Sequence, residues 1–249
     1  MKWRLIIDSH ARIAAENMAI DSALQKLCNV PVLRFYTWNP PAISIGRFQS
    51  LKDEIDIDYA KKNKIDFVRR VTGGGAVFHE NEITYSVSIK EENLFFPSDL
   101  HESYKEICQC IIAGLSQFGL KAEYIPINDI ILNGKKISGC AQTRKNNVIL
   151  QHGTLLIEVD VEKMFSVLKV PDEKIKDKLI ASVKDRVTCI NSELKRKVSQ
   201  TELINAIVNG FEKHLKIEFE QSELSEEELE MMKDIKKNVF ENEKWIFER

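Results

Sequence analysis

The sequence has little of what marks several common protein classes. It contains five cysteines in 249 residues, and none of them forms a C-x-x-C pair. A disulfide framework or a cysteine-ligated zinc site is therefore not expected, and the thiols favour a reducing compartment, with the cytoplasm as the expected location. No apolar run is long enough to span a bilayer, and charged residues follow too soon after the N-terminus for a secretory signal.

The sequence also lacks a charge excess of either sign. Its 36 basic and 38 acidic residues leave a net charge of −2, and its hydrophobic share of 43% is typical of a globular protein. Neither nucleic acid nor a membrane is an expected partner, so any phosphate binding has to be local. Repeats and Gly/Ser-rich linkers are absent, which favours one unit over residues 1–249. A domain boundary near Val170-Pro171 is an alternative.

The order of the expected elements predicts an α+β fold with a mixed, largely antiparallel sheet. Apolar or alternating runs predict strands over 3–7, 32–38, 42–45, 66–70, 83–89, 123–125, 130–143, 148–159 and 216–220. Helical spacing predicts helices over 11–28, 59–64 and 99–118. Asn133-Gly134 predicts a tight hairpin turn. Ser199 and Ser225, each followed three residues later by glutamate, predict the starts of two later helices. We expect the helical part from about 171 to 249 to pack on the sheet.

The densest cluster of glycines lies in residues 69–79, RRVTGGGAVFH, which holds three of the ten glycines of the chain. Glycine leaves room for a phosphate to approach backbone N–H groups, and Arg70 beside the loop can bind phosphate or carboxylate through two N–H groups. A flexible surface turn with a solvated pair of arginines is the alternative, and spacing alone leaves both open. The stretch is neither a Walker loop nor a G-x-G-x-x-G fingerprint.

A second segment, residues 128–142 (NDIILNGKKISGCAQ), places polar groups in what otherwise reads as buried strand. Strict alternation along it puts Lys136, Ser138 and Cys140 on one face and Gly139 on the other. A lysine that faces a site can neutralise a phosphate as a point charge. The alternative is ordinary hairpin charge.

A third segment, residues 150–156 (LQHGTLL), has the same character. Period-two alternation puts His152 and Thr154 on one face of this strand. They are candidates for a binding site, although a single histidine in an apolar strand is more often a hydrogen-bonded core residue.

Together these three segments resemble the lipoate–protein ligase family of the biotin/lipoate ligase superfamily. The first matches that family's double-arginine, triple-glycine, Ala-Val-Phe/Tyr-His motif. The second is similar to its Asn-Asp element and its Lys-Ile/Val-Ser-Gly-x-Ala segment, and the third to its His-Gly-Thr-Leu-Leu strand. Weaker likenesses over 17–21, 46–49 and 182–188 extend the match across most of the chain. The resemblance implies a biotin/lipoate ligase-like catalytic domain over residues 1–249. The small accessory domain that many members carry after the segment matching 242–247 is expected to be absent or to be a separate polypeptide.

The resemblance also implies an activity and its residues. Lipoate or octanoate would react with ATP to give an acyl-adenylate. The acyl group would then pass to a lysine of a lipoyl domain or of a glycine-cleavage carrier protein. Lys136 would be the catalytic cation, contacting the α-phosphate and the acyl carbonyl, and Asp129 would bind Mg²⁺. The other residues implied to bind substrate or nucleotide are Arg70, Gly73, Gly74, Gly75, Ala76, Val77, Phe78, His79, Asn128, Ser138, Gly139, His152 and Thr154. Candidates for an apolar tunnel around the acyl chain, equally plausible as core, are Trp38, Ile43, Ile45, Val77 and Phe78.

Two other functions stay open at this point. Relatives of the ligases move an octanoyl or lipoyl group between carrier proteins through a cysteine thioester, without ATP. Cys140 is the candidate nucleophile, but four residues of strand separate its Cα atom from that of Lys136 by roughly 13 Å. The transferase branch carries its cysteine in the loop before Asn128, where this chain has none. The third function is a non-catalytic lipoate-binding module. The lysine and the arginines of the family motifs are intact, which disfavours this alternative. Biotin ligation is disfavoured because the Gly-Arg-Gly-Arg loop of that branch is absent.

Overall fold

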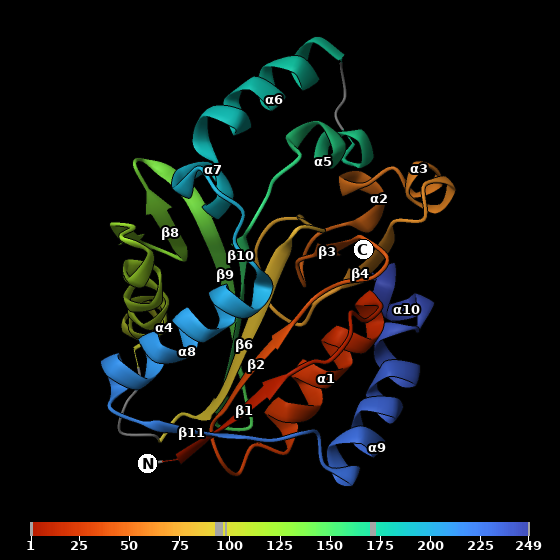
Figure 1. Ribbon diagram of the computed structural model, residues 1–249. Coiled ribbons are helices and arrows are strands. Elements are labelled where there is room, and N and C mark those ends of the chain that lie inside the picture. The colour runs from red at the N-terminus through yellow and green to blue at the C-terminus, as the bar shows by residue number, and fades with distance from the viewer. Residues whose placement is uncertain (1, 93–96, 98, 170–172, 249) are drawn as a thin grey trace.

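An eight-stranded sheet forms the centre of the computed structural model, which describes residues 2–92, 97, 99–169 and 173–248 (Figure 1). In order across the sheet its strands are β11 (Glu218–Gln221), β1 (Lys2–Ile7), β2 (Val32–Tyr36), β6 (Glu82–Lys90), β10 (Val148–Leu156), β9 (Lys135–Lys145), β8 (Asp129–Leu132) and β7 (Ala122–Ile125). The strands β11, β1 and β2 are mutually parallel, and the remaining pairs are antiparallel. The prediction of an α+β fold with a mixed, largely antiparallel sheet is confirmed.

A second, smaller sheet carries the glycine-rich stretch. It contains β4 (Asp66–Arg69), β3 (Ala42–Ile45) and β5 (Val77–His79), with β3 in the middle, parallel to β4 and antiparallel to β5. The glycine loop therefore connects the two outer strands of this sheet across the end of β3. The sequence did not predict β5, because three residues are too short a run for a strand pattern to be recognised.

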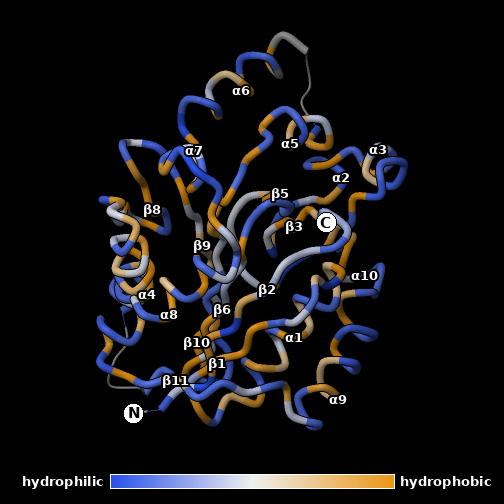
Figure 2. Tube along the Cα trace, viewed as in Figure 1, coloured by the Kyte–Doolittle hydropathy of each residue, from blue (hydrophilic) through white to orange (hydrophobic). Residues whose placement is uncertain are grey.

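Helices cover both faces of the large sheet. Their bounds are α1 (Ala14–Lys26), α2 (Leu51–Glu54), α3 (Ile57–Lys62), α4 (Leu100–Leu115), α5 (Val161–Val167), α6 (Glu173–Arg186), α7 (Ile190–Leu194), α8 (Gln200–Leu215), α9 (Glu226–Ile235) and α10 (Glu243–Ile246), with a 3₁₀ turn η1 (Ser116–Phe118) and a π turn η2 (Lys236–Phe240). The helices α4 and α8 bury one face of the sheet, and α1 with α9 covers the other (Figure 1). Hydrophobic residues follow the central strands and the helix faces that pack on them (Figure 2).

The turn and the helix starts that the sequence predicts are present in the structure. Asn133 and Gly134 have φ values of 51° and 77°, as the predicted hairpin turn requires. Ser225 starts α9 with a complete capping box. Ser199 caps α8, but the glutamate three residues later binds Arg196 instead of closing the box.

Of the C-terminal helices, α8 packs against α4 and α9 packs against α1. That the whole helical part from about 171 to 249 packs on the sheet stays a prediction. The alternative boundary near Val170-Pro171 lies outside the described residues. That residues 1–249 form one catalytic unit stays a prediction. Among the described helices, none combines the length and apolar character needed to cross a membrane.

A buried ion-pair network ties β2 to α1 beneath the smaller sheet. The Arg34 side chain is fully buried, with Nη2 2.7 Å from Asp8 Oδ2 and Nη1 2.9 Å from Asp21 Oδ1. Tyr36 and Ser86 also donate hydrogen bonds to Asp21, at 2.8 Å and 2.7 Å. Although burial opposes it, the hydrogen bond from a histidine on β10 and the charge of Arg34 lower the pKa of Asp21. The carboxylate is therefore held ionised at the base of the site described next.

Candidate functional site

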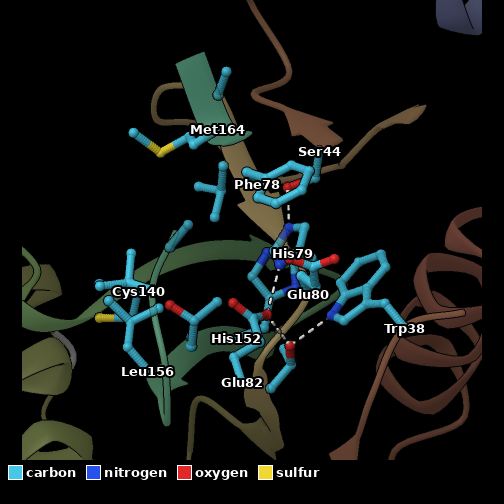
Figure 3. Close-up of a pocket in the computed structure, with 18 of the residues that line it drawn as sticks. Trp38, Ser44, Phe78, His79, Glu80, Glu82, Cys140, His152, Leu156 and Met164 are labelled. Carbon is cyan, nitrogen blue, oxygen red and sulfur yellow. Dashed lines mark hydrogen bonds and ion pairs between the residues drawn. The ribbon is translucent and has the colours of Figure 1, made fainter. Parts of the chain in front are cut away.

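A cavity of about 320 Å³ opens between the smaller sheet, the strands β6, β9 and β10, and the helices α5 and α6. It joins all three sequence segments that predicted a site (Figure 3). The predicted site residues that line it are Arg70, Gly74, Gly75, Ala76, Val77, Phe78, His79, Asn128, Lys136, Gly139, Cys140, His152 and Thr154. Gly73, Ser138 and Asp129 are not among the lining residues, although Asp129 contacts one of them.

Lys136 is held in place by its contacts to β8 and to its own strand. Its Nζ lies 2.7 Å from Asp129 Oδ1, and this buried oxygen makes no other hydrogen bond among the described residues. The lysine stem crosses Gly139, where a Cβ atom would lie 2.6 Å from Lys136 Cε and 2.7 Å from Nζ. Glycine is therefore required at 139 for this position of the ammonium group. The backbone of Lys136 also accepts a 2.9 Å hydrogen bond from Thr188 N, at the end of α6.

A β-bulge changes the expected faces of β9. Ile130 pairs with Ser138 but Ile131 pairs with Lys136, so one extra residue stands between them on β9. Strict alternation put Lys136 with Ser138 and Cys140, and this prediction is wrong, because the bulge brings Lys136 over Gly139 instead. Ser138 is only 1% exposed, its hydroxyl lacks a partner among the described residues, and it is not a lining residue, so its role in binding stays a prediction.

Cys140 lines the cavity but directs its thiol into the core. Its Sγ lies 3.8 Å from that of Cys108 on α4 and donates to Asn128 O at 3.2 Å. In Figure 3 the sulfur points away from the rings of His79 and His152. Burial and the contact with Cys140 raise the pKa of the Cys108 thiol well above its ordinary value. Cys108 and Cys140 therefore pack as small buried side chains between α4 and β9.

The glycine loop presents backbone donors to the cavity. Among the described residues, none accepts a hydrogen bond from the N–H groups of Gly74, Gly75 or Ala76, and all three residues line the cavity. Gly74 has a φ of 97°, and its carbonyl oxygen lies where a Cβ atom of Gly46 would come within 2.0 Å. The two glycines thus allow the loop to lie directly on β3. Free N–H groups in such a loop are typical of an anion site.

Arg70 supports this loop from below. The side chain donates to the carbonyl oxygens of Gly73 at 2.7 Å, Gly75 at 2.9 Å and Ser44 at 2.9 Å. It is only 4% exposed, and burial lowers the pKa of Arg70 to about 10. With Arg69 buried as well, the alternative of a solvated basic pair is wrong. In this conformation the guanidinium group of Arg70 hydrogen-bonds to the loop. Its positive charge therefore acts on the cavity at a distance, because it has no pair of N–H groups left to bind a ligand directly.

Two hydrogen-bonded branches run from Arg70 to buried carboxylates. In the first, Nε donates to Thr72 Oγ1 at 3.1 Å, Thr72 contacts His152 Nε2 at 2.8 Å, and His152 Nδ1 lies 3.2 Å from Asp21 Oδ2. His152 is thus a connector between Thr72 and the Arg34 network, whereas Thr154 stays a lining residue.

The second branch contains three residues that the sequence did not single out together. Arg70 Nη1 lies 3.2 Å from Ser44 Oγ, Ser44 Oγ lies 2.8 Å from His79 Nε2, and His79 Nδ1 lies 2.6 Å from Glu82 Oε1 (Figure 3). The ring of His79 stacks on Trp38, with centroids 4.0 Å apart. Neither Ser44 nor Glu82 has a signal in the sequence, because Ser44 lies within the apolar strand β3 and Glu82 is the first residue of β6, next to the polar residues Glu80 and Asn81.

Most of the remaining lining of the cavity is apolar, although four acidic residues, Glu80, Glu82, Glu158 and Asp160, also line it. Of the tunnel candidates, Trp38, Val77 and Phe78 line it, whereas Ile43 and Ile45 are fully buried in the core around α2 and α3. Lining residues that the sequence did not predict are Met18, Tyr36, Ser44, Glu80, Asn81, Glu82, Thr84, Ala141, Gly153, Leu156, Glu158, Val159, Asp160, Met164, Val183 and Val187. A polar end at the glycine loop and an apolar remainder suit a ligand with one anionic head and a hydrocarbon tail.

A resident metal ion does not fit the described residues. No three histidine, cysteine or acidic side chains among them come together as ligands. Asp129 offers one carboxylate, shared with Lys136. Magnesium in phosphoryl-transfer sites commonly takes one or two carboxylates and completes its shell with phosphate oxygens and water. Asp129 therefore fits only an ion that arrives with a nucleotide.

The His152 branch predicts acid sensitivity. Burial lowers the pKa of His152 against the opposing effect of Asp21, so the folded protein keeps the ring neutral. A histidine whose pKa is lower in the folded than in the unfolded protein stabilises the fold when the ring is neutral. This contribution is complete above the pKa of the unfolded state, about 6.5, and is lost as the pH falls toward the pKa of the folded state. We expect the melting temperature to fall between pH 7 and pH 5, and less so in His152→Gln. His214→Gln, a change outside the cavity, should keep the native slope. If the melting temperatures of the native protein and of His152→Gln fell equally with pH, His152 would not be the source of the acid sensitivity.

The comparisons with known proteins agree with this geometry. A family model described as the lipoyl protein ligase A/B catalytic domain matches residues 13–212. The chain is 36% identical over 274 aligned positions to an octanoyltransferase LipM from Anoxybacillus flavithermus, covering 99% of this chain and 98% of that protein. A chain from the structure of a bi-partite lipoate protein ligase and its E2 lipoyl domain from Thermoplasma acidophilum superposes with a TM-score of 0.91 at 30% identity, covering 99% of this chain and 96% of that one. A lipoate-protein ligase A bound with ATP gives a TM-score of 0.85 at 29% identity, covering 99% of both chains.

Proposed function

This chain belongs to the family of lipoyl protein ligase A/B catalytic domains, and from that premise we propose that it attaches a lipoyl or octanoyl group to a lysine of a lipoyl domain or of a glycine-cleavage carrier protein. We further propose that the acyl group is first activated with ATP as an acyl-adenylate. The acyl chain would occupy the apolar part of the cavity, and the carboxylate would face the glycine loop.

The charges around the cavity support adenylate formation. A carboxylate that attacks an α-phosphate brings two negative groups together, so cations and N–H donors must offset the charge that develops. Lys136 supplies an ammonium group at one side, and the N–H groups of Gly74, Gly75 and Ala76 lie at the other. Arg70 adds a buried positive charge behind the loop. In the second half-reaction, Lys136 would stabilise the oxyanion that forms on the acyl carbonyl when the acceptor amine attacks.

The orientation of Cys140 is the single observation that favours ATP over a thioester. Of the five cysteines, Cys140 alone lines the cavity, and its thiol faces Cys108 in the core. A nucleophilic thiolate needs exposure and a nearby cation or base. The bulge in β9 places the Lys136 ammonium over Gly139 and leaves the thiol in contact with the Asn128 carbonyl and Cys108.

A thioester transferase is the second candidate, and the naming of similar proteins as octanoyltransferases favours it. In that function an octanoyl group would pass from a donor carrier protein to an enzyme cysteine and then to the acceptor lysine. The alignment with the relative from Anoxybacillus flavithermus runs over 274 positions, more than the 249 residues of this chain. That relative therefore carries residues with no counterpart here, and its nucleophile need not correspond to Cys140.

Replacing Cys140 separates the two candidates. If the acyl group is activated with ATP, Cys140→Ser should lipoylate a lipoyl domain at the native rate when octanoate and ATP are supplied, with and without a candidate accessory protein. Cys28→Ser, a buried cysteine far from the cavity lining, is the matched control for loss of a thiol. Loss of transfer in Cys140→Ser alone, together with an octanoyl thioester on Cys140 of the native protein, would establish the transferase instead.

A further inference from the structure

Ser44, His79 and Glu82 have the arrangement of a nucleophile, a general base and a carboxylate that orients the base. The two contacts are 2.8 Å from Ser44 Oγ to His79 Nε2 and 2.6 Å from His79 Nδ1 to Glu82 Oε1, both within the range for such groups. All three residues line the cavity, although each is only 2% to 4% exposed, so the cavity is the route by which a substrate would reach Ser44. Figure 3 shows them in one chain of contacts that ends at Trp38.

The surrounding hydrogen bonds select the productive tautomer of His79. Trp38 Nε1 donates to Thr84 Oγ1 at 2.7 Å, so the Thr84 hydroxyl donates onward to Glu82 Oε1 at 2.7 Å. Glu82 is thereby held as an acceptor for the Nδ1 proton of His79. The other ring nitrogen, Nε2, is then free to accept the hydroxyl proton of Ser44.

The Ser44 branch differs from the Thr72 branch in the state of its carboxylate. Asp21, behind His152, is neutralised by Arg34 at 2.9 Å. Among the described residues no lysine or arginine contacts Glu82, so no cation competes with His79 for its Oε1 atom. The histidine contact is also shorter, 2.6 Å against 3.2 Å. Of the two hydroxyl groups next to Arg70, Ser44 is therefore the activated one.

We propose that Ser44, His79 and Glu82 form a nucleophilic triad that hydrolyses activated acyl groups bound in the cavity. The substrate class is a medium-chain acyl thioester, aryl ester or acyl-phosphate anhydride. Ser44 Oγ attacks the acyl carbonyl and gives its proton to His79 Nε2. The bond from the carbonyl carbon to the leaving group breaks, and the leaving group takes the proton from His79 Nε2. Where the leaving group departs as an anion, His79 releases that proton to water before the next step. Water then attacks the acyl-serine ester through His79, and the carboxylic acid and free Ser44 are regenerated.

Arg70 supplies the electrostatic part of this step. Its Nη1 lies 3.2 Å from Ser44 Oγ, so its buried positive charge would act at short range on the oxyanion, although its N–H groups already bind the loop and Ser44. The apolar lining gives the acyl chain its binding surface. This activity uses the acyl pocket of the proposed function but needs neither ATP nor an acceptor protein, so either activity can fail while the other is observed.

Covalent labelling of the full chain tests the triad directly. An octyl fluorophosphonate forms a stable adduct with an activated serine, and intact mass with peptide mapping locates it. We expect one adduct per chain, on Ser44. Hydrolysis of p-nitrophenyl octanoate without ATP should accompany it and should be blocked by the label. An unlabelled native chain, or a label on another residue, would overturn the proposal, and neither result bears on ATP-dependent lipoylation.

Variants separate a catalytic from a merely structural role. Ser44→Ala should lose the label, whereas Ser116→Ala, a serine outside the cavity, should label as the native protein does. Glu82→Gln should slow labelling by about 10²-fold or more, the effect of losing a general base or its orienting group. Its circular dichroism and melting curve show whether the fold is retained. Native-rate labelling of a folded Glu82→Gln protein would contradict the triad. If Glu82→Gln does not fold, the label site on the native chain decides.

Discussion

Replacing Lys136 by alanine is expected to lower the rate of acyl-adenylate formation by about 10² to 10³-fold, the usual effect of removing one preorganised charge donor from a transition state. The ammonium group is held by Asp129 and by the path of its side chain over Gly139. Transfer from synthetic octanoyl-adenylate to a lipoyl domain should fall as well, because the same cation would face the acyl carbonyl. Both rates are measured in single-turnover assays.

Lys135 provides the matched control for this substitution. It is the neighbouring lysine on β9, its Nζ lies 3.5 Å from the carbonyl oxygen of Lys184, and it does not line the cavity. Lys135→Ala should retain both half-reactions. A Lys136→Ala protein that forms adenylate at the native rate, with folding verified by its melting curve, would remove Lys136 from the mechanism.

Replacing Arg34 by methionine is expected to cost about 3–5 kcal/mol of folding stability, the usual penalty for removing one partner of a buried ion pair. The substitution leaves Asp21 buried without its arginine and leaves Asp8 with Arg12 as its remaining cation. Denaturant titration measures the loss as a lower unfolding midpoint. Because Asp21 also binds His152, we expect the substrate KM to rise in the fraction that folds.

An exposed ion pair serves as the control for Arg34. Arg196→Met removes the same type of charge from a pair with Glu202 in which both side chains are more than 40% exposed. Surface pairs of this kind contribute little, so the unfolding midpoint should stay within error. If the two substitutions lowered the unfolding midpoint equally, burial of the Arg34 network would not explain its contribution to folding stability.

The parts of the site that follow from contiguous motifs were predictable from the sequence. The glycine loop, Lys136 and His152 all lie on one cavity, although the three segments come from different strands. Their order along the chain and their resemblance to one family carried this prediction. Residue type and spacing alone left the loop open between a phosphate site and a surface turn.

The parts that depend on tertiary geometry were not predictable. A single extra residue in β9 moved Lys136 from the side of Ser138 to that of Gly139, and alternation cannot reveal a bulge. Arg70 supports the loop from a buried position, because the carbonyl oxygens of Gly73 and Gly75 turn toward it. Ser44 and Glu82 meet His79 only when β3, β5 and β6 are brought together.

Membership of this family indicates which acyl group is transferred, but it leaves open which molecule donates that group. The curated relatives are named as octanoyltransferases, whereas the similar solved structures include ligases. The fold is common to both, so the difference must come from the groups that face the acyl carbonyl. In this chain an ammonium group and a loop of free N–H donors line the cavity, and the one cysteine among the described residues that lines it has its thiol turned into the core.

The most direct test of ATP-dependent activation is a single turnover without any acceptor protein. The purified chain is mixed with octanoate, ATP and Mg²⁺, and pyrophosphate and octanoyl-adenylate are measured by mass spectrometry. We predict that both appear together, in amounts up to one per chain, and that Lys135→Ala forms them equally well. Formation of neither product, with an octanoyl group passing instead from a donor carrier protein to Cys140, would contradict the proposed activation.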